Sequence, residues 1–167
     1  MRVILISMPD VVPIIIHEMA IHMPNQGIAS VGGNIDEDHD VYLIDLIRKR
    51  RKIRRYLVKQ IKKIEPDLIG LSAMSWQYDT SVRIARLIKE IAPEVKIVLG
   101  GYHATLMSDE IAASPEARYF DFIIRGEGEE SFVDLLNRIR EGRATDQVDG
   151  LVYRDSLVFP ATPALWG

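Results

Sequence analysis

The chain has 167 residues, a formal net charge of −3 and an apolar fraction of 47%, which is the composition of an ordinary globular protein with a sizeable core. It contains no cysteine, so disulfides, iron–sulfur clusters and thiolate metal sites within the chain are excluded. No apolar run approaches the ~20 residues that a membrane span needs, and the first residues lack the pattern of a signal peptide. We therefore expect a cytoplasmic protein that does not enter a membrane.

Short apolar runs alternate with amphipathic segments along most of the chain. The runs are typical of buried parallel strands, which we expect at residues 2–7, 40–46, 68–73, 96–99 and 120–124. The segments between them have the apolar spacing of helices, which we expect at residues 27–35, 48–64, 79–91, 104–113 and 129–140. Together they predict an α/β fold with a doubly wound, five-stranded parallel sheet, flavodoxin-like or Rossmann-like. Right-handed crossovers favour the strand order 2-1-3-4-5.

Two segments fall outside this alternation. Residues 8–26 contain three prolines and many apolar residues, which predicts a loop that lies over the sheet edge. Residues 151–153 and 157–159 flank a polar turn and predict a β-hairpin. We expect one domain over residues 1–145, a hairpin extension of that domain over 146–160, and the start of an interdomain linker over 161–167.

The carboxyl edge of the predicted sheet is the expected ligand site, because ligands of open α/β sheets bind where the strand order reverses. That point lies between the first and third strands, so the loops after strands 1, 3 and 4 should rim the pocket. Gly100 and Gly101 end the fourth strand and would let a ligand approach bare backbone. We expect a side chain placed at Gly101 to project into the groove.

Other signals at the same edge have two explanations each. After the third strand, Ser72 and Ser75 offer hydroxyls and Trp76 offers a flat apolar surface, but a buried serine and a packing tryptophan fit equally well. The acidic stretch from Gly126 to Glu130 is sufficiently explained as a helix start, where carboxylates complement the helix dipole.

Motifs for nucleotides, phosphotransfer and metals are weak. The first strand is not followed by Gly-x-Gly-x-x-Gly, no Gly-x-x-x-x-Gly-Lys occurs, and Asp10 alone does not form the aspartate cluster of a receiver domain. His17 and His22 are five residues apart, which leaves their rings about 140° apart on a helix. A zinc pair needs both on one face, so a loop with two histidines is the simpler explanation.

The predicted second helix is strongly basic, with ten Lys and Arg residues between positions 48 and 63. A solvated helix face is the first explanation, and docking against another domain is the second. Nucleic-acid binding comes last, because the net charge is negative and aromatic residues other than Tyr56 do not interleave with the basic ones.

Several motifs stand in order at the ends of the predicted strands, before the first helix and at the start of the second strand. They are Pro24-Asn25-Gln26-Gly27-Ile28-Ala29, Asp38-His39-Asp40-Val41, Gly70-Leu71-Ser72-Ala73-Met74, Leu99-Gly100-Gly101-Tyr102-His103-Ala104-Thr105 and Arg125-Gly126-Glu127-Gly128-Glu129. This set resembles the amino-terminal cobalamin-binding domain of cobalamin-dependent radical S-adenosylmethionine (SAM) enzymes. The resemblance covers roughly residues 1–160.

Two departures from related patterns bear on this resemblance. The radical half of such enzymes carries Cys-x-x-x-Cys-x-x-Cys, and this chain has no cysteine. We therefore expect a fragment whose partner is a C-terminal radical SAM domain in cis, which would hold SAM and a 4Fe-4S cluster. The Asp-x-His-x-x-Gly motif that supplies a histidine to cobalt in mutases is also absent, as it commonly is in the radical enzymes.

The resemblance implies base-off cobalamin without a histidine ligand, its nucleotide tail running past Ser72 and over Gly100 and Gly101, in an enzyme that transfers a methyl group. The cofactor-binding residues that it implies are Asn25, Gln26, Gly27, Ser72, Ala73, Met74, Ser75, Gly100, Gly101, Tyr102, His103, Gly126, Glu127 and Gly128. We expect no catalytic residue and no metal ligand in this chain. The alternative is a flavodoxin-like ligand-binding or interaction module that does not bind cobalamin.

Overall fold

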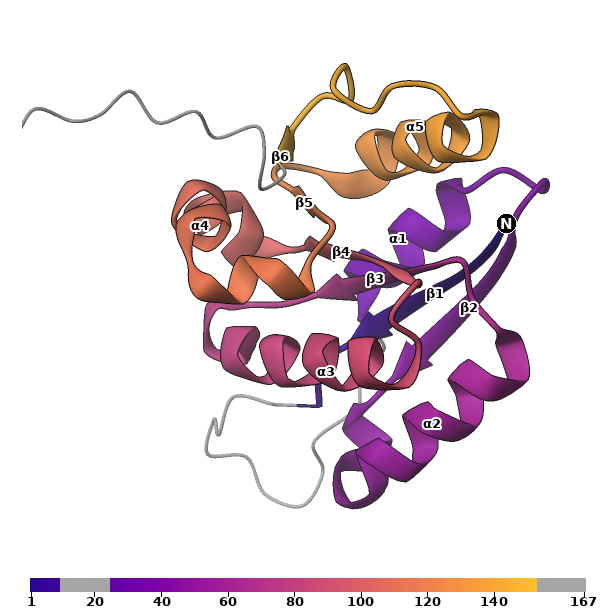
Figure 1. Ribbon diagram of the computed structural model, residues 1–167, viewed down its shortest axis with the longest axis vertical. Coiled ribbons are helices and arrows are strands. Elements are labelled where there is room, and N and C mark those ends of the chain that lie inside the picture. The colour runs from indigo at the N-terminus through magenta and orange to yellow at the C-terminus, as the bar shows by residue number, and fades with distance from the viewer. Residues whose placement is uncertain (10–24, 153–167) are drawn as a thin grey trace, which may run out of the picture.

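The computed structural model describes residues 1–9 and 25–152. A six-stranded sheet in the order β2-β1-β3-β4-β5-β6 forms its centre (Figure 1). The strands are β1 (Arg2–Ser7), β2 (Asp40–Asp45), β3 (Leu68–Ser72), β4 (Lys96–Gly100), β5 (Phe122–Ile124) and β6 (Leu151–Val152). The first five pair in parallel, which confirms the predicted order. The first arm of the predicted hairpin is β6, which pairs antiparallel with β5 and extends the sheet, whereas residues 157–159 lie outside the described residues.

All five predicted helices are present. They are α1 (Gln26–Asn34), α2 (Ile53–Ile64), α3 (Tyr78–Ile91), α4 (Tyr102–Ala113) and α5 (Gly128–Glu141). Three 3-10 segments accompany them, η1 (Ile47–Lys52), η2 (Ser75–Gln77) and η3 (Pro115–Tyr119). The predicted second helix is therefore divided into η1 and α2, and β5 starts two residues later than predicted because η3 carries the chain almost to that strand.

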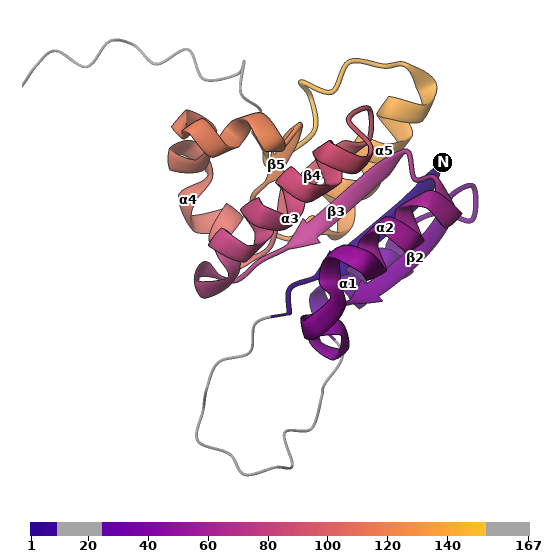
Figure 2. The ribbon, with the colours of Figure 1, turned by 60° about the horizontal axis from the view of Figure 1, so that its bottom comes forward.

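Helices cover both faces of the sheet (Figures 1 and 2). Residues of α2, α3 and α4 share one apolar core with alternate strand residues such as Ile97 and Leu99. Residues of α1 and α5 share a second core with the other alternate residues, such as Leu5 and Val98. Successive side chains of a strand point to opposite faces, so each central strand contributes to both cores.

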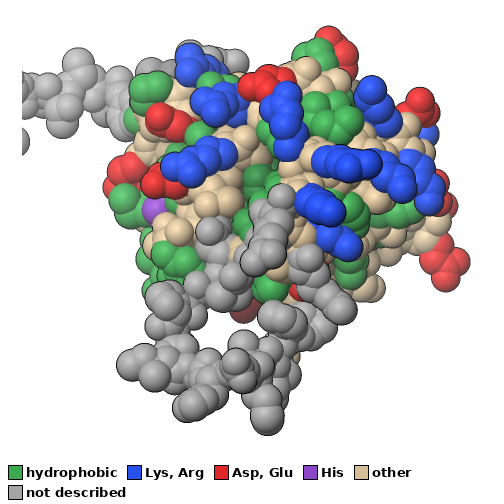
Figure 3. All heavy atoms as spheres, turned by 90° about the horizontal axis from the view of Figure 1, so that it is seen from below, with side chains coloured by type: hydrophobic (Ala, Val, Ile, Leu, Met, Phe, Trp, Pro, Cys, Tyr) green, Lys and Arg blue, Asp and Glu red, His purple; other side chains and the backbone are tan. Residues whose placement is uncertain are grey.

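The surface over α2 and α3 is rich in Lys and Arg side chains (Figure 3). On α2 the buried stripe is Leu57, Ile61 and Ile64, and the remaining positions include exposed basic residues. One of these, Arg54, forms an ion pair with Glu90 of α3 at 3.4 Å. Within residues 1–9 and 25–152, no helix is both long enough and apolar enough to cross a bilayer.

Candidate ligand-binding site

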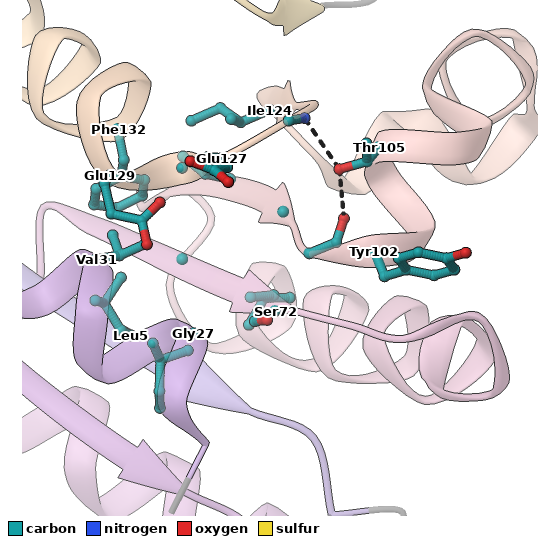
Figure 4. A pocket seen from close by; sticks show the side chains of 18 residues that line it. Leu5, Gly27, Val31, Ser72, Tyr102, Thr105, Ile124, Glu127, Glu129 and Phe132 are labelled. Atoms are coloured by element: carbon teal, nitrogen blue, oxygen red, sulfur yellow. Dashed lines mark hydrogen bonds between the residues drawn. The ribbon is translucent and has the colours of Figure 1, made fainter.

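A pocket of about 450 Å³ lies at the carboxyl edge of the sheet, on the face that carries α1 and α5 (Figure 4). Its walls come from the ends of β3, β4 and β5, from β1, and from the first turns of α1, α4 and α5. The predicted edge is therefore the one that is hollowed. The hollow lies further toward β5 than the predicted rim, and residues 10–24 of the loop after β1, with His17 and His22, lie outside the described residues.

Small residues on neighbouring strands create this hollow. Gly70 and Ser72 alternate along β3, and they pair in register with Val98 and Gly100 of β4. Their alternation places them on the same face as Leu5, which pairs with Gly70. A Cβ atom built at Gly100 would meet no heavy atom within 4 Å. The strands themselves therefore leave room above this part of the sheet.

The floor of the pocket is closed where Gly70 lies. A Cβ atom at this position would lie 2.7 Å from Cδ2 of Leu5 and 3.2 Å from the Phe132 ring. These two side chains thus pack directly over the glycine, and a larger residue at position 70 would force them apart. Gly70 is required for the packing between β1, β3 and α5.

The two ends of the pocket differ in polarity (Figure 4). Leu5, Val31 and Phe132 lie at the end between α1 and α5, which we call the inner end. Ser72 and Thr105 lie at the other end, beside the turn from β4 into α4, and contribute hydroxyl groups there. An elongated ligand with one apolar and one polar part would match this division.

Thr105 joins two turns that border the pocket. Its Oγ1 donates a hydrogen bond to the carbonyl oxygen of Gly101 at 3.1 Å and accepts one from the backbone N–H of Gly126 at 3.0 Å (Figure 4). The β4–α4 turn and the β5–α5 turn are thereby held together. The sequence places Thr105 within a motif, but only the structure shows this function.

The expectation that a side chain at Gly101 would enter the groove is wrong. Gly101 has φ +93°, and its Cβ would lie 2.9 Å from both the N and the O atoms of Ala73. The same turn places the N–H of His103 3.2 Å from the carbonyl oxygen of Ala73. Gly101 therefore permits α4 to begin against the end of β3, and Gly100 is the glycine that faces open space.

The structure brings part of the predicted cofactor-binding set to the pocket. The predicted residues that line it are Gly27, Ser72, Gly100, Gly101, Tyr102, Gly126, Glu127 and Gly128. The predicted residues outside its lining are Asn25, Gln26, Ala73, Met74, Ser75 and His103. Among these, Asn25 caps α1, because its Oδ1 accepts a hydrogen bond from the N–H of Ile28 at 3.1 Å.

His103 points away from the pocket, toward α3. Its ring lies 4.5 Å from that of Tyr78, centroid to centroid, and its Nδ1 has no hydrogen-bond partner within the described part of the chain. Burial lowers the pKa of His103, against the opposing effect of the Asp79 and Glu110 carboxylates. His39 lies at the opposite edge of the sheet, just before β2, and its Nε2 is 3.2 Å from Oδ1 of Asn137.

Sequence reasoning missed most of the apolar lining. The missed residues are Leu5, Ile28, Val31, Gly70, Leu71, Val98, Thr105, Ile124, Glu129 and Phe132. Most of them look like ordinary core residues of a strand or helix. The signal that could have found the pocket was the spacing of Gly70 and Ser72 two residues apart, aligned with Val98 and Gly100 on the next strand.

Comparisons with known proteins agree with this fold. Residues 12–136 match the family model described as the B12 binding domain. The uncharacterized methyltransferase PH0819 of Pyrococcus horikoshii is 30% identical over 133 residues, covering 80% of this chain and 28% of that protein. The family match favours cobalamin over the alternative of a module that does not bind it.

Two solved structures share the fold. The radical SAM methyltransferase TsrM of Kitasatospora setae, with cobalamin and a 4Fe-4S cluster bound, aligns with a TM-score of 0.71 and 21% identity, covering 91% of this chain and 27% of that one. The cobalamin-dependent SAM radical enzyme OxsB, with aqua-cobalamin bound, aligns with a TM-score of 0.70 and 21% identity, covering 91% and 20%. The chain thus spans less than a third of the length of these proteins. Because the family model matches most of the chain, this protein belongs to the B12-binding domain family.

Proposed function

We propose that the chain holds base-off cobalamin as the cofactor domain of a larger radical SAM enzyme that transfers a methyl group. The nucleotide tail of the cofactor would lie in the pocket, and its corrin ring would cover the carboxyl edge of the sheet. The observation that carries this proposal is the hollow above Ser72 and Gly100, which opens at that edge in a chain of the B12-binding family.

The residues present fit such a tail. Its base is flat and mostly apolar, as is the inner end of the pocket at Leu5, Val31 and Phe132. Its sugar and phosphate need polar partners. Ser72 supplies a hydroxyl at the other end, and Oγ1 of Thr105, which already donates to Gly101, can accept a hydrogen bond from a sugar hydroxyl there. Gly100 leaves the space between these ends free of side-chain atoms. The pocket thus offers each part of the tail a matching environment.

This domain would bind and orient the cofactor and leave the chemistry to it. Bound cobalamin supplies a cobalt centre that can carry a methyl group. The chain's own contribution is to hold the tail and to present a surface at the sheet edge. Exposed large apolar side chains gather there, in the segments after β3 and β4, with Trp76 52%, Tyr102 55% and Leu106 55% exposed. Such side chains suit a corrin ring or a second domain as their cover.

The second domain would be a radical SAM domain in cis, following the linker that starts near residue 161. Support comes from the larger size of the relatives, of which the chain spans 28% or less in the examples above. SAM and the 4Fe-4S cluster would belong to that domain, since this chain has no cysteine to hold a cluster. The 167-residue chain alone is expected to bind cofactor without catalysing methyl transfer.

The proposal is tested by titrating the chain with cobalamin and measuring retention on a sizing column together with the visible spectrum. Gly100→Val should weaken binding by at least about a hundredfold, because the new side chain fills the pocket at a position where a strand readily accepts valine. Gly33→Val is the matched control, since Gly33 lies on α1 with no heavy atom within 4 Å of a built Cβ. Undiminished binding by Gly100→Val would show that the tail does not occupy this pocket.

The base-off state has its own test. The absence of the Asp-x-His-x-x-Gly motif leaves no histidine in the setting that usually orients one toward cobalt. Electron paramagnetic resonance of the bound cob(II)alamin form should therefore show no superhyperfine splitting from a nitrogen ligand. Splitting that disappears in His17→Ala or His22→Ala would contradict this part of the proposal.

A further inference from the structure

The inner end of the pocket is apolar on every side that the described residues supply. Leu5, Val98 and Phe132 are buried members of the α1/α5 core, and Val31 is a partly buried residue packed against it. The backbone there is paired within the sheet, because β3 takes part in both the β1–β3 and β3–β4 ladders at Gly70. A ligand group placed against these side chains and β3 meets carbon atoms and strand backbone whose hydrogen bonds are already made. The first turn of α5, which has no side-chain cap among the described residues, lies at the rim of this end.

One charged group lies at the rim of this end. The side chain of Glu129, in the first turn of α5, points toward Val31 (Figure 4). It is partly exposed. An ionised carboxylate can only accept hydrogen bonds. It can therefore serve a ligand amino group but not the lone pairs of aromatic ring nitrogens.

We propose that the inner end selects corrinoids by their lower base, and that it takes dimethylbenzimidazole in preference to adenine. This inference rests on the proposed function, because it assumes that the tail enters the pocket. The outer edge of dimethylbenzimidazole carries only C–H and methyl groups, which suit Leu5, Val31 and Phe132. Adenine carries an amino group and two further ring nitrogens, and against these side chains the ring nitrogens would lose water without gaining a side-chain donor.

The expected size of the selectivity follows from the cost of burying unpaired polar groups. One such loss weakens binding by about tenfold or more, so the adenine form should bind at least about tenfold less tightly. Coordination of the lower base to cobalt, by contrast, favours binding of the adenine form. Adenine is the less basic ligand and leaves cobalt more easily, so its tail is freed at lower cost. A preference for dimethylbenzimidazole therefore has to come from the pocket.

The test compares dissociation constants of the 167-residue chain for three corrinoids that share the same upper ligand. They are cobalamin, its counterpart with adenine as lower base, and cobinamide, which lacks the nucleotide. We expect cobalamin to bind most tightly, the adenine form at least about tenfold more weakly, and cobinamide most weakly of all. Equal or tighter binding of the adenine form, with cobinamide still weak, overturns the selectivity and leaves the proposed function standing. Cobinamide binding as tightly as cobalamin, or no binding by any, overturns both.

A variant locates the selectivity. Val31→Thr keeps the side-chain shape and adds a hydroxyl at the inner end, so it should narrow the preference for cobalamin by about threefold or more. Val58→Thr makes the same change on helix α2, away from the pocket, and should leave the ratio of the two dissociation constants unchanged. Circular dichroism confirms that both variants fold. A ratio that is unchanged in Val31→Thr overturns the assignment of selectivity to this lining, and the wild-type comparison does not depend on either variant.

Discussion

The two faces of the central strands differ: one is filled by a core, and the other carries a pocket. On the face toward α2, α3 and α4, residues such as Ile97 and Leu99 are fully buried in a continuous core. On the face toward α1 and α5, the alternate positions include Ser72 and Gly100, and a pocket remains above them. Since alternation alone decides which face a residue joins, side-chain size at every second position separates packing from binding.

The largest expected effect is a difference in the free energy of unfolding when the same substitution, Ile to Ala, is made on each face of the sheet. Ile97→Ala should lower the free energy of unfolding by about 2–5 kcal/mol, because Ile97 is wholly buried in the closed core and leaves a cavity. Ile124→Ala should cost clearly less, because Ile124 lines the pocket and the lost volume joins an existing hollow. Urea unfolding of both variants measures the difference. Equal costs would contradict the distinction between the faces.

The second-largest effect is expected at the two adjacent glycines of the β4–α4 turn, where alanine substitutions should differ in their cost to stability. Gly101→Ala should destabilise the protein by about 1–3 kcal/mol, because its Cβ meets the Ala73 backbone and φ is +93°. Gly100→Ala places its methyl group in open space and should change stability by no more than about 0.5 kcal/mol. Thermal or urea unfolding distinguishes them, and a reversed order would mean that Gly100 is the constrained position.

A smaller effect is expected at Thr105. Thr105→Val keeps the shape of the side chain but removes the hydrogen bonds to Gly101 and Gly126. The loss should be about 0.5–1.5 kcal/mol of stability, with weaker cobalamin binding because the two turns bordering the pocket are released from each other. Thr105→Ser retains the hydroxyl and is the control. If Val and Ser variants bind cobalamin equally well, the link between the turns does not shape the pocket.

The smallest expected effect is a pH dependence of stability that arises from His103, whose ring packs toward α3. Burial lowers the pKa of His103, so the unfolded chain takes up this proton more readily than the folded chain. The contribution of His103 to stability is complete above its ordinary pKa of about 6.5 and declines as pH falls toward the lower folded value. His103→Phe retains a ring against Tyr78 and should flatten this decline. Urea midpoints at about pH 7.5 and about pH 5 measure it, and an unchanged slope would assign the dependence to other groups.

The fold was predictable because its signals are local. Apolar runs of strand length, amphipathic helices and breaks at glycine or proline repeat along the chain, and right-handed crossovers then leave few strand orders. Part of the pocket lining was predictable from a residue type at a strand end, as at Gly100, whereas Gly126 and Gly128 were named only from the family resemblance. The apolar lining was not, because Leu5 or Phe132 has the same local pattern whether it faces a helix or a hollow.

The sequence by itself determined the parallel sheet, its order and the edge at which the strands end, since these follow from periodicity and chain handedness. The tertiary structure decided which glycine faces the pocket and which one faces the end of β3, because that depends on how closely Gly101 approaches Ala73. It also turned His103 toward Tyr78 and away from the pocket. A strand pattern states which face a side chain joins, but only the packing of distant segments determines whether that face is filled or left open.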